Sequence, residues 1–275
     1  VSKTMTLAQR LYESGLITYM RTDSVNLSNE AKSQAKVEII KRFGEQYYHG
    51  RDYKNKSSNA QEAHEAIRPT NMKVQNITVD YDQKRLYELI WKRTISSQMS
   101  QAKLERTTLK VGSNTYENLF IAKGEILTFD GFLKVYLEGL DEEEEKFQGI
   151  LPNVKIGDKL KLNSIESTQR FTRPPSRFTE ASLVRKLEEL GIGRPSTYAP
   201  TISTIQARGY ILKGENEGIE RNYKKIKLQQ EKISSSTLIE RISSEKGKLI
   251  PSDIGIIVND FLVNNFEEIL SYNFT

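Results

Sequence analysis

Apolar residues recur at helical spacing through the first hundred residues of the chain. Thr6 is followed three residues later by Gln9, which is the spacing of a capping box, so a short helix is predicted from Thr6 to a stop at Gly15. A second helix is predicted from 28 to 44, and a longer amphipathic helix from 81 to 99. This first part is therefore predicted to be mostly helical.

The pattern changes in the next part of the chain. Short segments rich in β-branched or aromatic residues follow one another, separated by Gly, Asn and Asp, at 107–111, 116–122, 132–137 and 159–163. They predict an antiparallel sheet. An unbroken acidic run at 141–145 is predicted to be a solvated loop that would repel a polyanion.

Helical spacing then returns. Helices are predicted from Thr179 to Gly191 and from Ser196 to Gly209, and a third helix is predicted to begin at Ser252. The polar stretch 213–250 is predicted to be a hairpin or a connection.

These patterns predict an α+β, multi-domain chain in which mainly helical domains are joined by an antiparallel β segment. The predicted domains are 1–104 (helical), 105–172 (β-rich) and 173–275 (helical).

Composition narrows the possible functions. The chain has 275 residues and a formal net charge of +5, which permits a polyanionic partner. It contains no cysteine, so disulfides, zinc–thiolate sites and thiol nucleophiles are excluded. Only two histidines are present, which argues against a histidine-based metal site, and no metal ligands are predicted in this chain. No apolar run approaches the roughly 20 residues of a membrane span.

The segment around Tyr19 carries the strongest candidate chemistry. Tyr19 lies two residues before Arg21 and four before Asp23, and in an extended segment residues two apart share a face. A phenol is a weak nucleophile near neutrality because its pKa is about 10. A neighbouring guanidinium can hold a phosphate and neutralise the charge that builds on it. The alternative is a buried tyrosine beside a surface arginine that pairs with Asp23.

The sequence GLITYMRTDS at 15–24 resembles the active-site tyrosine motif of type IA DNA topoisomerases. Further stretches agree in the order of that family, namely QEAHEAIRPT at 61–70, PPSRFTEASLV at 174–184, GIGRPSTYA at 191–199 and ISTIQARGY at 202–210. The bacterial topoisomerase I subfamily is favoured, because Met20 stands where topoisomerase III enzymes carry proline.

The resemblance implies ATP-independent relaxation of negatively supercoiled DNA. In this family one strand is cleaved through a 5′-phosphotyrosine, the other strand is passed, and the break is religated. By this resemblance Tyr19 is the nucleophile, Arg21 contacts the scissile phosphate, and Thr18 and Asp23 support them.

His64 is implied as a third catalytic residue. If its segment is helical, His64 and Arg68 share a face, and we expect His64 to hydrogen-bond Asp23. Whether His64 donates a proton or only binds phosphate stays open, as does a purely structural histidine. Arg68 is either a phosphate ligand or a partner of Glu65, and both are candidate supporting residues.

A second group of residues is predicted to bind single-stranded DNA. Ser196 and Thr197 stand at a helix start, where free N–H groups favour a phosphate, and Arg194 precedes them. Arg208 lies about three turns further along and would meet another phosphate. The alternative is that Ser196 merely caps its helix.

The resemblance also sets expectations about the longer enzyme. We expect the chain to be an excised piece of it, inactive alone, because the family binds Mg²⁺ in a Toprim domain that the chain lacks. The expected partner is single-stranded or underwound duplex DNA, with no membrane. The enzyme is expected to be monomeric, cytoplasmic and nucleoid-associated. The alternatives are a topoisomerase III-like decatenase, a non-catalytic single-strand-binding module, and a tyrosine recombinase, which carries its tyrosine late in the chain.

Overall fold

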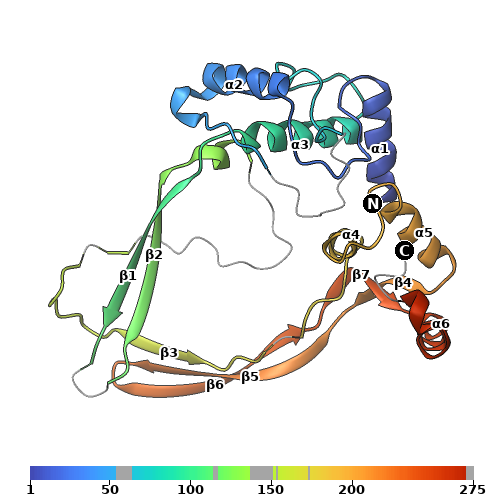
Figure 1. Cartoon of the computed structure of the whole chain (residues 1–275). Coiled ribbons are helices and arrows are strands. Elements are labelled where there is room, and N and C mark those ends of the chain that lie inside the picture. The colour runs from blue at the N-terminus through green and yellow to red at the C-terminus, as the bar shows by residue number, and fades with distance from the viewer. Residues whose placement is uncertain (54–63, 114–116, 137–150, 153, 173, 271–275) are drawn as a thin grey trace. The chain divides into compact units, whose positions relative to one another are not determined.

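A computed structural model describes the chain except for residues 54–63, 114–116, 137–150, 153, 173 and 271–275 (Figure 1). The chain divides into two compact units. One comprises Lys3–Ile156, and the other comprises Val1–Ser2 with Gly157–Thr275. Both contain helices and antiparallel strands, so the predicted α+β class is confirmed. The predicted boundaries 1–104, 105–172 and 173–275 stay a prediction.

The helices of the first unit are α1 (Ser2–Glu13), α2 (Asn29–Phe43), the short 3-10 helix η1 (Glu45–Tyr47) and α3 (Tyr81–Ser97). Gly15 ends the α1 region with φ +69°, as predicted, and the Ser28 hydroxyl caps α2 by accepting from the Ala31 N–H. The predicted start of α1 at Thr6 is wrong. The helix begins four residues earlier because Met5, ahead of Thr6, already packs against the core.

One hydrophobic core holds this unit together. Trp91 and Ile95 of α3 are 1% and 0% exposed, and they share the core with Ile39 of α2 and Leu11 of α1. The Trp91 indole N–H donates to the Met72 carbonyl at 2.9 Å, which satisfies its polar atom inside the core. Figure 1 shows α2 and α3 running side by side above the paired strands.

A two-stranded antiparallel ribbon extends from these helices, made of β1 (Lys103–Val111) and β2 (Phe120–Phe129). The predicted strand at 132–137 is wrong, because residues Gly131–Lys134 form the 3-10 helix η2. Phe129, Phe132 and Val135 recur every third residue and all pack against the core, a spacing that suits a helix rather than a strand. The predicted acidic loop at 141–145 lies outside the described residues.

The second unit is built on two small antiparallel sheets. The order of the first is β3 (Ser164–Thr168), β5 (Ile219–Gln229) and β6 (Lys232–Ile242), and the second pairs β4 (Ile211–Asn216) with β7 (Glu245–Pro251). The predicted strand at 159–163 lies at 164–168 instead, where it pairs with β5. The stretch 213–250 was predicted to be a hairpin or a connection. It contains most of the residues of four strands, β4 to β7. Its strands carry many exposed polar residues, so they show little apolar alternation.

The helices of this unit are α4 (Glu180–Glu189), α5 (Tyr198–Ala207), α6 (Asp253–Asn265) and the short α7 (Glu267–Leu270). Thr179 and Ser252 cap α4 and α6 through their hydroxyls, as predicted. The predicted cap at Ser196 is wrong: the residue before α5 is Thr197. Its hydroxyl accepts from the Arg194 N–H at 2.8 Å, so it closes the preceding turn instead of capping the helix.

Within the described residues, no helix combines the length and apolar character needed to cross a membrane.

Candidate functional site

Two segments far apart in the sequence are joined around Tyr19. The Thr18 N–H donates to the Arg68 carbonyl at 2.9 Å, and the Arg68 N–H donates back to the Thr18 hydroxyl at 2.9 Å. The Thr18 hydroxyl in turn donates to the Ala66 carbonyl at 2.8 Å. Ile17 and Pro69 form an antiparallel bridge beside them. The 64–70 segment therefore holds the Tyr19 segment in place.

Thr18 is the centre of this junction, and its loss is expected to destabilise it. Thr18→Val keeps the side-chain shape but leaves the Ala66 carbonyl and the Arg68 N–H without their partner, which should lower the free energy of unfolding by about 2 kcal/mol. Thr18→Ser keeps the hydroxyl and should cost far less. Urea unfolding of the three proteins measures this difference, and equal midpoints for Val and Ser would contradict the assignment.

The Tyr19 segment alternates between core and solvent. Ile17 and Met20 are 1% and 4% exposed, whereas the Tyr19 side chain is 37% exposed and Arg21 is also exposed. Met20 thus anchors the segment while the phenol and the guanidinium on either side of it reach solvent. The alternative of a buried tyrosine is wrong.

Two rings flank the Tyr19 phenol. The Tyr12 ring meets it edge-on, with centroids 5.3 Å apart and planes at 69°, and the His64 imidazole lies 5.9 Å away at 49°. Sequence analysis missed Tyr12. The signal was present, because α1 ends at Glu13 and the Gly15 turn brings the chain back beside the last turn of that helix.

His64 lies beside Tyr19, as the catalytic prediction requires, but not in the way that was expected. The segment 64–68 is not helical, because the Ala66 N–H donates to the Asn26 carbonyl at 2.8 Å instead of to a helical partner. The predicted hydrogen bond between His64 and Asp23 is wrong for the structure as described. Arg21 and Asp23, which both lie within the described residues, form no ion pair. The alternative of a surface arginine paired with Asp23 is therefore wrong too.

Arg68 is held by Glu65. Its Nε and Nη2 donate to the two Glu65 carboxylate oxygens at 2.7 and 2.9 Å, and the same carboxylate accepts from the Ser28 N–H at 2.8 Å. Burial raises the pKa of the Glu65 carboxyl, but the hydrogen bonds from Arg68 and Ser28 outweigh burial and leave the pKa below its usual value. Of the two alternatives for Arg68, its pairing with Glu65 is present, and its contact with phosphate stays a prediction.

The second predicted group lies in the other unit, around α5. Arg194, Ser196 and Thr197 are exposed just before the helix, and Arg208 is exposed at its far end as the C-cap residue. The ten residues of α5 span about 15 Å and separate Arg194 from Arg208, and the contact of either residue with DNA stays a prediction. No side chain among the described residues pairs with Arg208, whereas Arg194 donates to the Gly193 carbonyl at 2.8 Å.

Among the described residues, no group of three or more His, Cys, Asp or Glu side chains is placed to hold a metal ion.

Comparison with known proteins identifies relatives of the whole chain. A family model described as DNA topoisomerase matches residues 1–222. A protein of Acanthamoeba polyphaga mimivirus named "DNA topoisomerase 1 type prokaryotic" is 41% identical over 297 residues, which cover 100% of this chain and 34% of that protein. The "DNA topoisomerase 1" of Rickettsia conorii is 42% identical over 99% of this chain and 33% of its own length.

A solved structure agrees with these relatives. Full-length topoisomerase I from Thermotoga maritima superposes with a TM-score of 0.72 at 34% identity, covering 100% of this chain and 40% of that protein. The chain thus spans about a third of the length of the curated relatives described above.

Proposed function

This chain belongs to the bacterial type IA DNA topoisomerase I family, and on that premise we propose that it supplies the nucleophile of an enzyme that relaxes negatively supercoiled DNA. The observation that supports this most is the placement of Tyr19. Tyr19 is 37% exposed, its ring is flanked by His64, and Arg21, two residues further along the chain, is exposed as well.

The proposed reaction exchanges one phosphodiester for another. The Tyr19 phenolic oxygen attacks the DNA phosphorus, a new O–P bond forms, and the P–O bond to the 3′ oxygen breaks. The phenol proton leaves to a base or to solvent, and the departing 3′ oxygen gains a proton. The resulting 5′-phosphotyrosine keeps the bond energy of the backbone, so the reverse attack reseals the strand without ATP.

Arg21 and His64 act on the same phosphate in this proposal. The Arg21 guanidinium binds two phosphate oxygens and neutralises charge in the transition state, which an ammonium group cannot do with the same geometry. His64 approaches from the other segment, where its imidazole binds phosphate or transfers a proton. Asp23 is two residues from Arg21 and limits the net positive charge of the segment.

We propose that the α5 region binds the single strand away from the break. Arg208→Ala should weaken binding of a single-stranded oligonucleotide and reduce the salt dependence of the binding constant by about one unit of slope. Arg185→Ala serves as a control, because Arg185 carries the same charge but lies on α4, outside the group of residues proposed to bind the strand. Unchanged binding by Arg208→Ala at every salt concentration would show that the strand runs elsewhere.

Magnesium, a monomeric state and action on the nucleoid in the cytoplasm remain proposals about the longer enzyme. We propose that Mg²⁺ binds in a part of the longer enzyme outside this chain. Within this chain, the groups that we propose to contact phosphate are Arg21, His64 and the helix start at Thr197.

Plasmid relaxation tests the proposal at the level of the whole enzyme. The chain alone should bind single-stranded DNA without relaxing a negatively supercoiled plasmid, and the full-length enzyme should relax it without ATP. Relaxation by the chain alone would contradict the proposal that other parts are required. A full-length enzyme that binds single strands but never relaxes the plasmid would indicate a binding module.

A further inference from the structure

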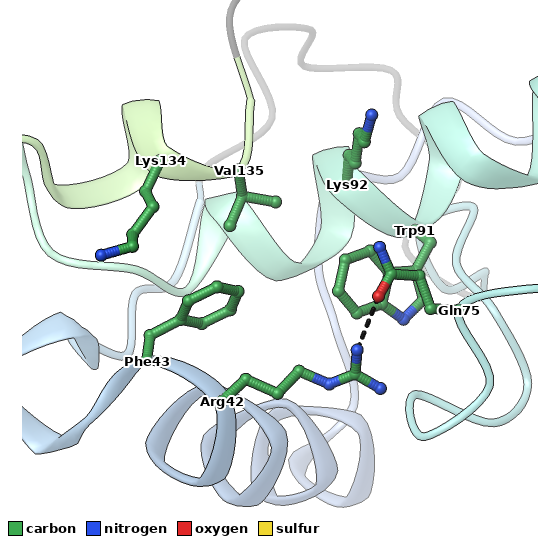
Figure 2. A pocket seen from close by; sticks show the side chains of 7 residues that line it. All are labelled: Arg42, Phe43, Gln75, Trp91, Lys92, Lys134 and Val135. Atoms are coloured by element: carbon green, nitrogen blue, oxygen red, sulfur yellow. Dashed lines mark hydrogen bonds between the residues drawn. The ribbon is translucent and has the colours of Figure 1, made fainter.

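A pocket of about 350 Å³ lies between α2, α3 and η2, all within the Lys3–Ile156 unit (Figure 2). Its volume is within the range of pockets that bind small molecules. Its lining includes Arg42, Phe43, Trp91, Lys92, Lys134 and Val135. The lining contains three cationic side chains and no carboxylate, and each cation pairs with a carboxylate outside the lining, namely Glu38, Glu88 or Asp130.

Arg42 is a fixed part of the pocket. Its guanidinium donates to the Glu38 carboxylate at 3.0 Å, to the Gln75 side chain at 2.6 Å and to the Lys73 carbonyl at 3.0 Å. The same group lies 5.0 Å from the centre of the Trp91 ring. Three of its five N–H donors are engaged by the protein, so Arg42 is held in place on one side of the pocket.

The two lysines are available for that capture. Lys92 pairs with Glu88 at 2.6 Å, but both side chains are about two-fifths exposed, and such surface pairs contribute at most about 1 kcal/mol. Lys134 donates to the Tyr47 hydroxyl at 3.1 Å and lies 3.8 Å from Asp130. The bond to Tyr47 raises the pKa of Lys134, so this ammonium group stays charged at neutral pH. An ammonium group carries three donors, so each lysine keeps donors for a phosphate.

Apolar groups separate the two lysines. Figure 2 shows the Phe43 ring and the Val135 methyl groups between Lys134 at one side and Lys92 at the other. Within a nucleic-acid strand each base has a phosphate on both sides, whereas a mononucleotide has only one. The order of the lining, a lysine, then the apolar Phe43 and Val135, then a second lysine, corresponds to one unit of a strand, which has a base between two phosphates.

We propose that this pocket binds one nucleotide of a single strand, with its base against Phe43 and Val135 and its flanking phosphates on Lys92 and Lys134. The contact is separate from the Tyr19 site and involves none of the residues assigned to cleavage. It would hold a second stretch of strand on the same unit that carries the nucleophile.

Trp91 is the only tryptophan in the chain and lines the pocket; because it is 1% exposed, its emission reports on the pocket through its neighbours, among them the Arg42 guanidinium 5.0 Å from its ring centre. The chain is titrated with a short oligothymidylate, with thymidine monophosphate and with inorganic phosphate while Trp91 emission is followed. Lys92→Gln and Lys134→Gln should each weaken binding of the oligonucleotide, as followed by the change in Trp91 emission. Each should also reduce the salt dependence of the binding constant by about 0.7 units of slope. Lys84→Gln removes the same charge from an exposed position of α3 outside the pocket and should change neither quantity.

The three probes distinguish the source of the ligand. A saturable change with the oligonucleotide that far exceeds the response to the monophosphate supports a strand. An equal response to the monophosphate supports the pocket but overturns the strand as its ligand. No change in emission with any probe, or a change that both lysine substitutions leave intact, overturns the proposal. Circular dichroism of each variant excludes misfolding, and Tyr19→Phe should bind as the unsubstituted chain does.

Discussion

Tyr19→Phe in the full-length enzyme should abolish the covalent protein–DNA adduct and reduce relaxation by at least about 10⁴-fold, because the substitution removes the attacking oxygen. Phenylalanine keeps the ring that packs between Tyr12 and His64, so the segment should remain folded and single-strand binding should persist. The measurement uses an oligonucleotide with a label 5′ or 3′ of the break, incubated with enzyme and then denatured.

The matched control for this substitution is Tyr81→Phe. Tyr81 is 72% exposed at the start of α3 and belongs to neither predicted site, so loss of its hydroxyl should leave the adduct unchanged. If the adduct survives Tyr19→Phe, another residue is the nucleophile. If both substitutions abolish it, the loss does not report on Tyr19 specifically.

Arg21→Ala should slow cleavage by about 10²–10³-fold, which is the loss measured when one preorganised charge-stabilising group is removed. Oligonucleotide binding should weaken by less than about tenfold, because Arg21 is one phosphate contact among several. Since Arg21 has no ion-pair partner within the described structure, its removal leaves no carboxylate unpaired there and should have little effect on folding.

Arg21→Lys separates charge from geometry. Lysine restores the charge but not the pair of parallel donors, so it should recover binding more fully than cleavage. Single-turnover cleavage and equilibrium binding, measured on the same oligonucleotide, give the two quantities. If Arg21→Ala weakened binding as much as cleavage, the arginine would be a ground-state contact, and its assignment to the transition state would be wrong.

Local chemistry made several helix ends predictable, whereas Tyr19 was assigned as the nucleophile through the resemblance of its segment to a known family. The caps at Ser28, Thr179 and Ser252 and the turn at Gly15 depend on side chains and φ values within a few residues, so a sequence reveals them. The exposure of Tyr19 was not predicted in this way, because the spacing of Tyr19, Arg21 and Asp23 left a buried tyrosine open.

The remaining features depend on contacts distant in the sequence. Nothing near His64 shows that the Ala66 N–H binds the Asn26 carbonyl, and that bond prevents the expected helix. The 3-10 helix at Gly131 forms because its chain is drawn onto the core, where the Phe132 N–H donates to the Ser100 carbonyl at 2.9 Å. The Thr18 junction likewise spans about fifty residues, beyond the reach of any local pattern.

The most direct measurement is to locate the residue that carries DNA. The full-length enzyme is trapped on a single-stranded oligonucleotide, the adduct is digested with nuclease and protease, and the modified peptide is sequenced by mass spectrometry. A nucleotide attached through its 5′ phosphate to the peptide that contains Tyr19, at the Tyr19 side chain, is the predicted result. A nucleotide on any other residue, or an attachment through a 3′ phosphate, would contradict the account.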